Sequence, residues 1–291
     1  MNSVNCDVAV VGAGPTGLAL AVLLAQLGRS VIVLEQWPAP YALPRAVHFD
    51  DEVGRLLQSC GIEDELRDLS EPAEVYEWRN GAGTTLLRFG RLGTGAPGWP
   101  FSSMFCQPDL EAALESRARS LPTIDVRRGV TVDELVQRDD RVELGLASGG
   151  VVTARYAVGC DGANSTVRSL LDLGVADRGF FYDWLIVDVI LDEPRIFDPI
   201  NLQVCNPARP TTAVSGGPGR RRWEFMRLPD ETLEELGRES VAWKLLEEWD
   251  VHPGNSRIER HAVYTFQARV TERWQEGRSS LSKVSWPSRP E

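Results

Sequence analysis

The sequence has few cysteines and few histidines for its 291 residues. The cysteines are far apart, odd in number and never spaced as C-x-x-C, which argues against a disulfide framework and a zinc site. The histidines have no metal-ligand spacing, so no metal is expected. A reducing cytoplasm is therefore the expected location. The residues concerned are Cys6, Cys60, Cys106, Cys160, Cys205, His48, His252 and His261.

Positive charge is also scarce, with 31 Lys and Arg residues against 42 Asp and Glu residues. A surface for nucleic acid or anionic membrane needs basic clusters, so neither is an expected partner. There is no apolar run of about 18 residues and no basic N-terminal region, so we expect neither a membrane span nor export. The composition is that of a folded protein with one large domain or two intertwined ones.

What is present near the N-terminus is a β-α-β pattern. An apolar run at residues 8–11 leads into Gly12-Ala13-Gly14-Pro15-Thr16-Gly17. A helix-like stretch at 18–27 follows, and residues 31–34 form a second apolar run that ends in Glu35. A glycine-rich turn between a strand and a helix, with an acidic residue closing the next strand, is typical of dinucleotide-binding domains.

The residues of this turn have separate tasks. We expect Gly12 to make the tight turn, Gly14 to let the backbone approach a pyrophosphate, and Gly17 to let the helix pack closely. Pro15 and Thr16 begin the helix, whose free N–H groups favour phosphates. A glycine-rich turn without a ligand is the alternative, and the motif alone does not distinguish FAD from NAD.

Glu35 and its neighbour Gln36 complete this part of the candidate cofactor site. The Glu35 carboxylate can accept hydrogen bonds from both ribose hydroxyls, a charge-assisted contact worth roughly 1.5–3 kcal/mol. An NADP 2′-phosphate is expected to be repelled there.

Later segments mix helices and strands. A hairpin is predicted at residues 75–89 around Asn80-Gly81, and helices are predicted at 51–60 and from Pro108 onward. Strands at 124–146 and 151–158 lead into Cys160-Asp161-Gly162. Beyond about residue 180 the chain changes character, and we predict a second, sheet-rich layer. Its expected elements are strands at 184–191, 201–205, 223–228 and 262–270 and a helix at 231–249.

Several short stretches give the chain a family resemblance in their order and spacing. They are Leu43-Pro44-Arg45-Ala46 with Asp50-Asp51-Glu52, Gly98-Trp99-Pro100 with Gln107-Pro108, Cys160-Asp161-Gly162-Ala163-Asn164-Ser165 with Val167-Arg168, Pro207-Ala208-Arg209-Pro210, Arg222-Trp223-Glu224-Phe225-Met226, and Val263-Tyr264-Thr265 with Ala268-Arg269. With them, residues 5–278 resemble the p-hydroxybenzoate hydroxylase-like flavoprotein monooxygenases, most closely the 3-(3-hydroxyphenyl)propionate hydroxylase branch.

The resemblance implies an α/β fold, with a Rossmann-like FAD-binding domain and an inserted and following β-sheet substrate domain. The implied division is 1–180 for the FAD-binding domain, interrupted by a hairpin near 75–90, and 181–275 for the substrate domain. It also implies FAD as cofactor, NAD(P)H as a transient reductant, and O2 and a small aromatic molecule as substrates. The sequence has no second G-x-G-x-x-G unit, which fits a reductant without a domain of its own.

The resemblance assigns two further residues to FAD. Arg45 is implied to lie over the pyrophosphate and ribose, since a guanidinium fork suits phosphate oxygens. The alternative is a surface ion pair with Asp50 or Asp51. Gln107 is implied to bind the ribitol side, with helix N-capping as the alternative.

Asp161 and Gly162 are implied to serve both FAD and the visiting nicotinamide nucleotide. The alternative for Asp161 is capping of a helix that starts near Asn164, and both roles can coexist.

The sequence nominates no catalytic acid or base. Four aromatic residues after position 180 are candidates for a wall around an aromatic substrate, although as bare sequence each fits the core better. They are Trp184, Trp223, Phe225 and Tyr264.

After Gly277-Arg278 the chain departs from the family, which continues with an apolar strand and a Gly-Asp-Ala-Ala-His type motif. The last residues are instead rich in Ser and Pro, so 276–291 is predicted to be an unstructured tail outside the family pattern. We therefore expect an exposed sheet edge, weak FAD binding and slow or absent hydroxylation. A non-catalytic FAD- or ADP-binding fragment, or another flavin-dependent oxidoreductase of this fold group, stays an alternative.

Overall fold

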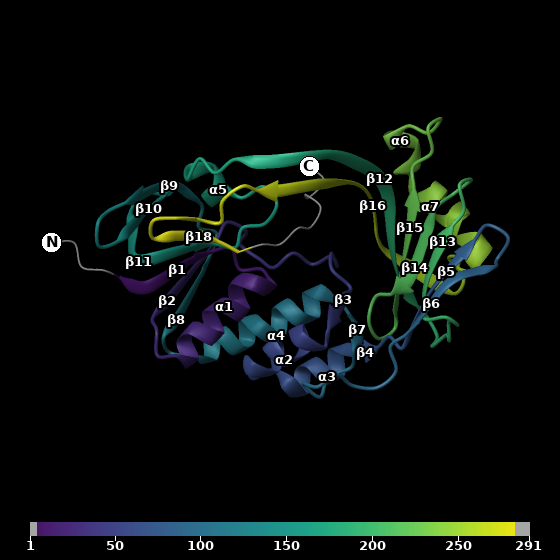
Figure 1. Ribbon diagram of the computed structural model, residues 1–291, viewed down its shortest axis with the longest axis horizontal. Coiled ribbons are helices and arrows are strands. Elements are labelled where there is room, and N and C mark those ends of the chain that lie inside the picture. The colour runs from purple at the N-terminus through teal and green to yellow at the C-terminus, as the bar shows by residue number, and fades with distance from the viewer. Residues whose placement is uncertain (1–4, 283–291) are drawn as a thin grey trace.

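The computed structural model describes residues 5–282 of the chain. Its two larger sheets lie at opposite ends of an elongated molecule, with helices packed below the first sheet and beside the second (Figure 1). The predicted β-α-β unit is present as β1 (Cys6–Val11), α1 (Pro15–Gln26) and β2 (Val31–Glu35). β1 and β2 pair in parallel, as the crossover through α1 requires.

The first sheet has eight strands, and β1 lies at its centre between β2 and β11 (Val151–Gly159). β8 (Ile124–Arg128) extends the sheet beyond β2, while β9 (Val132–Gln137) and β10 (Val142–Leu146) form an antiparallel extension from β11.

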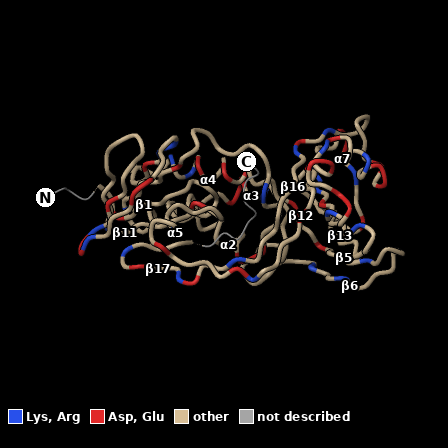
Figure 2. Tube along the Cα trace, turned by 90° about the horizontal axis from the view of Figure 1, so that it is seen from above, with Lys and Arg blue, Asp and Glu red and all other residues tan. Residues whose placement is uncertain are grey.

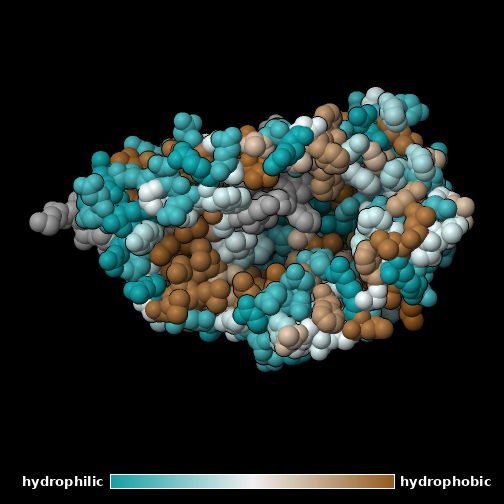
Figure 3. All heavy atoms as spheres, in the orientation of Figure 1, coloured by the Kyte–Doolittle hydropathy of each residue, from teal (hydrophilic) through white to brown (hydrophobic). Residues whose placement is uncertain are grey.

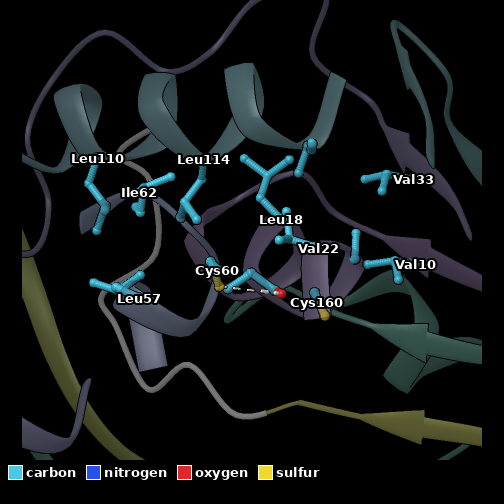
Figure 4. Packing of buried hydrophobic residues seen from close by; sticks show 14 of the residues in the cluster. Val10, Leu18, Val22, Val33, Leu57, Cys60, Ile62, Leu110, Leu114 and Cys160 are labelled. Atoms are coloured by element: carbon cyan, nitrogen blue, oxygen red, sulfur yellow. Dashed lines mark hydrogen bonds between the residues drawn. The ribbon is translucent and has the colours of Figure 1, made fainter. Parts of the chain in front are cut away.

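Both faces of the parallel strands are buried, which explains their almost unbroken apolar sequence. On one face, α1 packs against α4 (Gln107–Ser120), and Leu18 and Val22 meet Leu110 and Leu114 in one hydrophobic cluster (Figure 4). The opposite face is covered by β9, β10 and the short helix α5 (Thr166–Leu170). The glycine-rich turn after β1 is therefore supported by a sheet that is packed on both faces.

Below α4 the chain forms α2 (Asp51–Ser59), α3 (Glu63–Leu69) and a small sheet. That sheet has the order β3 (His48–Asp50), β7 (Ser102–Phe105) and β4 (Ser70–Pro72). None of the helices among residues 5–282 is both long enough and apolar enough to cross a membrane.

The second sheet has seven strands. In spatial order they are β16 (Ser256–Thr271), β12 (Val175–Leu191), β15 (Arg220–Met226), β14 (Thr211–Ser215), β13 (Asn201–Cys205), β5 (Val75–Asn80) and β6 (Thr85–Gly90). The predicted hairpin is thus present as β5 and β6, and its parallel pairing with β13 places it in the second sheet. One face of this sheet packs against α6 (Leu233–Leu236), α7 (Glu239–Leu246) and the 3₁₀ turn Glu247–Trp249.

β12 and β16 are long enough to belong to both halves of the molecule. They pair from Val175 with Thr271 to Leu191 with Ser256, and they run side by side as a ribbon between the two halves (Figures 1 and 2). Figure 2 also shows acidic and basic residues interspersed along both halves of the chain.

The prediction of an unstructured tail over 276–291 is wrong for part of that segment. Ser279–Leu281 form β18, which pairs in parallel with β11, while β17 (Gln275–Glu276) pairs antiparallel with β18. Ser279 is fully buried. Backbone hydrogen bonds to β11 and β17 make this short strand, so its side chains need no apolar alternation. Residues 283–291 of the predicted tail lie outside the described residues.

Glu77 ties the β5–β6 hairpin together. Its buried carboxylate accepts hydrogen bonds from the Arg79 guanidinium at 2.5 Å, from the Thr85 hydroxyl at 2.9 Å and from the Arg88 guanidinium. The hydrogen bond from Arg79 contributes most to holding the pKa of Glu77 at about 2. The ordinary value is about 4.3.

The variant E77Q tests this cluster. Because the pKa of Glu77 is lower in the folded than in the unfolded chain, its stabilisation is present above the unfolded pKa and is lost as pH falls toward about 2. E77Q should therefore unfold at a lower temperature than wild type near neutral pH, and the difference should shrink on acidification. Circular dichroism melts over this pH range measure it, with E74Q at an exposed position as the control. A difference that stays constant with pH would contradict this assignment.

Candidate cofactor site

The turn after β1, the end of β2, the segment around Arg45, the start of α4 and the loop after β11 surround one cavity of about 370 Å³. Ten of the eleven predicted cofactor residues line it; these are Gly12, Gly14, Pro15, Thr16, Glu35, Gln36, Arg45, Gln107, Asp161 and Gly162. Gly17 does not line the cavity but lies buried in the first turn of α1. Residues far apart in sequence thus meet at one groove, as the sequence predicts.

The three glycines of the turn differ in what surrounds them. Gly12 has a positive φ of 107°, and a Cβ there would lie 2.5 Å from the carbonyl oxygen of Cys160. A Cβ on Gly17 would lie 2.0 Å from the carbonyl oxygen of Gly12. Beside Gly14 there is open space within 4 Å. The fold itself therefore needs glycine at 12 and 17, whereas Gly14 leaves room for a ligand.

Glu35 joins the end of β2 to the glycine-rich turn. Its Oε2 accepts a hydrogen bond from the Ala13 N–H at 2.8 Å, and its Oε1 accepts one from the Trp37 N–H at 2.9 Å. Each carboxylate oxygen keeps a second lone pair, so Glu35 can also accept hydrogen bonds from a ligand in the cavity.

Arg45 makes neither of the ion pairs that the sequence leaves open with Asp50 and Asp51. Its Nη2 lies 2.9 Å from Oε1 of Glu111, which is buried in α4. Its guanidinium also lies over the ring of Tyr41, at 5.3 Å from the ring centroid. Arg45 is thereby held at the cavity wall.

Gln107 holds the same segment through its side-chain amide. Its Oε1 accepts a hydrogen bond from the Ala46 N–H at 2.7 Å, and its Nε2 donates to Oε1 of Glu111 at 2.5 Å. The N-cap residue of α4 is Cys106, and no side chain caps it. Gln107 therefore does not cap the helix, which was the alternative.

Sequence reasoning missed Glu111, although it also lines the cavity. Burial raises the pKa of this carboxyl, and the charge of Arg45 opposes that rise. Its position one helical turn after Gln107 was the available signal, since residues four apart share a helix face.

Asp161 has the capping role that the sequence left open. Its Oδ1 accepts a hydrogen bond from the Ser165 hydroxyl at 2.5 Å, and its Oδ2 accepts one from the Val167 N–H at 3.0 Å. Ser165 in turn caps α5 through the Arg168 N–H. Asp161 still lines the cavity with Gly162, so capping and ligand binding are compatible.

The second sheet contacts this site through Arg222, another residue that sequence reasoning missed. Its buried guanidinium pairs with Asp188 at 2.6 Å and donates to the backbone carbonyls of Pro44 at 3.1 Å and Arg45 at 2.5 Å. Arg260 also donates to the Pro44 carbonyl. Side chains of the second sheet thus position the Arg45 segment.

The four aromatic candidates divide between the two faces of the second sheet. Trp223 and Phe225 belong to the core cluster between the sheet and α7, so their side chains are part of the core and do not line a substrate site. Trp184 and Tyr264 are paired neighbours on β12 and β16, and the Arg260 guanidinium lies over the Tyr264 ring at 4.9 Å.

Fold and site together define an α/β protein of the dinucleotide-binding type, in which side chains of a second sheet hold the backbone of one segment that lines the cavity. Residues 5–281 match a family described as the FAD binding domain, and the chain belongs to that family.

Two curated relatives share its sequence over most of its length. The chain is 38% identical to a probable NADH-specific resorcinol 4-hydroxylase of Rhodococcus jostii (strain RHA1), covering 95% of this chain and 53% of the relative. It is 31% identical to the 3-(3-hydroxy-phenyl)propionate/3-hydroxycinnamic acid hydroxylase of Escherichia coli (strain K12), covering 96% and 50%. The chain spans about half the length of the curated relatives it matches.

Solved structures share the fold. Aklavinone-11 hydroxylase, solved with FAD and aklavinone, matches with a TM-score of 0.79 and 25% identity over 100% of this chain and 59% of that one. The p-nitrophenol 4-monooxygenase of Pseudomonas putida matches with a TM-score of 0.83 and 23% identity over 99% and 74%. At that identity the second likeness concerns the fold alone.

Two glycine variants distinguish a glycine that leaves room for a ligand from one that the fold requires. G14A adds a methyl group to open cavity at a φ of −77°, which alanine adopts freely. We expect G14A to keep the wild-type melting temperature and to weaken FAD binding about tenfold or more. G17A places its methyl group against the Gly12 carbonyl and should lose stability by about 1–3 kcal/mol.

Melting of the FAD-free proteins by circular dichroism and titration with FAD by flavin fluorescence measure the two effects separately. If G14A bound FAD as tightly as wild type, the cavity beside Gly14 would not be the cofactor site.

Proposed function

We propose that this chain holds FAD in the cavity described above and forms the cofactor-binding part of an NAD(P)H-dependent monooxygenase that hydroxylates a phenolic ring. The observation that supports it most is the convergence of the glycine-rich turn, Glu35, Arg45, Gln107 and the Asp161 loop on one cavity. The names of the curated relatives, both aromatic hydroxylases, point to the same chemistry.

The residues present fit an extended dinucleotide. The N-terminus of α1 faces the cavity with no capping side chain and no acidic residue in its first turn. Its N–H groups can therefore receive a pyrophosphate beside Gly14. Arg45 uses Nη2 for Glu111, so the rest of its guanidinium fork is available to phosphate oxygens. Glu35 would hold the adenosine ribose, and Gln107 the ribitol.

Bound FAD would supply electron transfer from the nicotinamide and activation of O2. The protein's own contribution is to bind, orient and shield. We propose that residues 1–180 hold the cofactor, while residues 181–275 and the β5–β6 hairpin hold a small aromatic substrate. The hydrogen bonds of Arg222 to the carbonyls of Pro44 and Arg45 would keep these two parts in a fixed position relative to each other.

We also propose that the chain acts in the reducing cytoplasm. All the cysteines are free thiols, and four of them are buried. Burial raises the pKa of Cys6, Cys60 and Cys160 to about 11, which keeps these thiols protonated and unreactive.

An assay of NADH oxidation tests the proposed function. The purified chain, loaded with FAD, should oxidise NADH faster when resorcinol or 3-(3-hydroxyphenyl)propionate is added, and chromatography should find a product with one more hydroxyl group. G14A under the same conditions is the control for a reaction of free flavin. FAD binding without phenol-dependent NADH oxidation would instead favour the non-catalytic alternative, in which the chain binds the cofactor alone.

A further inference from the structure

One face of the second sheet lies toward the proposed cofactor-binding half of the molecule, and this face carries an acidic residue, Glu224. Side chains alternate along β15, so Trp223 and Phe225 enter the core under α7 while Arg222 and Glu224 lie on the opposite face. Arg222 reaches the carbonyls of Pro44 and Arg45, and Arg45 lines the cofactor cavity. Glu224 therefore belongs to the face that meets the cofactor half of the molecule.

Glu224 lacks a hydrogen-bond donor or ion-pair partner in the described part of the chain. Arg222, its neighbour on this face, is occupied by Asp188 and the two backbone carbonyls. The cross-strand neighbours of Glu224 are Ile186, which is apolar, and Thr212, whose hydroxyl donates to Gln203 at 2.7 Å. The surrounding protein thus leaves this carboxylate without a donor.

The carboxylate of Glu224 is therefore free to accept a hydrogen bond from water or from a ligand. Glu224 is half-buried, and burial raises its pKa although the charge of Arg222 opposes the rise. Partial burial weakens the solvation of a carboxylate, so a hydrogen-bond donor placed beside it is favourable. A ligand with a hydroxyl group in this place would satisfy it.

The surroundings suit an aromatic ring. Ile186 and Trp184 on β12 and Met226 on β15 share the face of Glu224, because Ile186 is paired with Glu224 and Trp184 with Met226. Tyr76 on β5 is close enough for the charge of Glu224 to add to the burial that raises its pKa. In Figure 3 a hollow opens between the two halves of the molecule, with both hydrophilic and hydrophobic residues around it.

We propose that Glu224 accepts the hydrogen bond of a ring hydroxyl of the substrate, so that the site selects aromatic compounds with a free phenolic hydroxyl. This inference rests on the proposed function and names a specificity-determining residue for it. The apolar and aromatic neighbours would contact the ring, and Arg222 would hold the sheet against the cofactor segment.

The test compares two ligands of similar shape on the FAD-loaded protein. Resorcinol donates hydrogen bonds, whereas 1,3-dimethoxybenzene does not, and calorimetry measures both without a flavin signal. Wild type should prefer resorcinol on the order of 10- to 100-fold, the range expected for a hydrogen bond to a charged group. E224M should abolish that preference, and E224Q should reduce it. Neither variant should change the dissociation constant of FAD.

E193Q, at an exposed position after β12, is the matched control and should bind both ligands like wild type. E224Q keeps the side-chain volume. If E224M fails to fold, the reduced resorcinol preference expected for E224Q is the test. Retention of the full resorcinol preference in the variants, or its absence in wild type, overturns the role of Glu224. Failure of wild type to bind FAD contradicts the proposed function instead, because FAD is titrated separately.

Discussion

The buried ion pair between Arg222 and Asp188 is the interaction on which the arrangement of this site depends. Pro44 and Arg45 lie outside any strand, so their carbonyls need donors from elsewhere. Arg222 supplies a donor to each, while Asp188 balances its charge. Burial disfavours the charged guanidinium, yet the carboxylate of Asp188 leaves the pKa of Arg222 raised. Removing one partner of such a pair costs about 3–5 kcal/mol.

The same segment is held from the other side by α4. Gln107 accepts from the Ala46 N–H, and Glu111 pairs with Arg45. Because the polar groups that hold this segment are themselves paired, the network fixes one backbone conformation. A guanidinium held on a fixed backbone loses little entropy when it binds an anion, which supports the proposal that this short segment is part of the cofactor site.

The parts of the site that could be predicted from sequence are those with local signatures. The glycine-rich turn and Glu35 belong to one β-α-β unit, so their pattern can be recognised within about thirty residues of sequence. Arg45, Gln107 and Asp161 were found only through family resemblance. Glu111 was missed although it lies one helical turn after Gln107, because its ion pair with Arg45 joins residues far apart in sequence. Arg222 was missed because all its partners are distant, and a buried charge in a strand resembles a surface one until its partner is known. The sequence also could not place β5, β6 and β18, since a short strand takes its sheet from tertiary pairing.

The paired strands β12 and β16 run through both halves of the molecule and connect them. A rotation of one half against the other has to bend both strands together, since they are paired along most of the span. Pairing is interrupted between Asp177 and Phe181 and again between Asp188 and Val189, and bends concentrate where a ladder is already broken. Asp188 lies at the second interruption and pairs with Arg222, so bending of the ribbon there would also shift the hydrogen bonds that hold the backbone of Pro44 and Arg45.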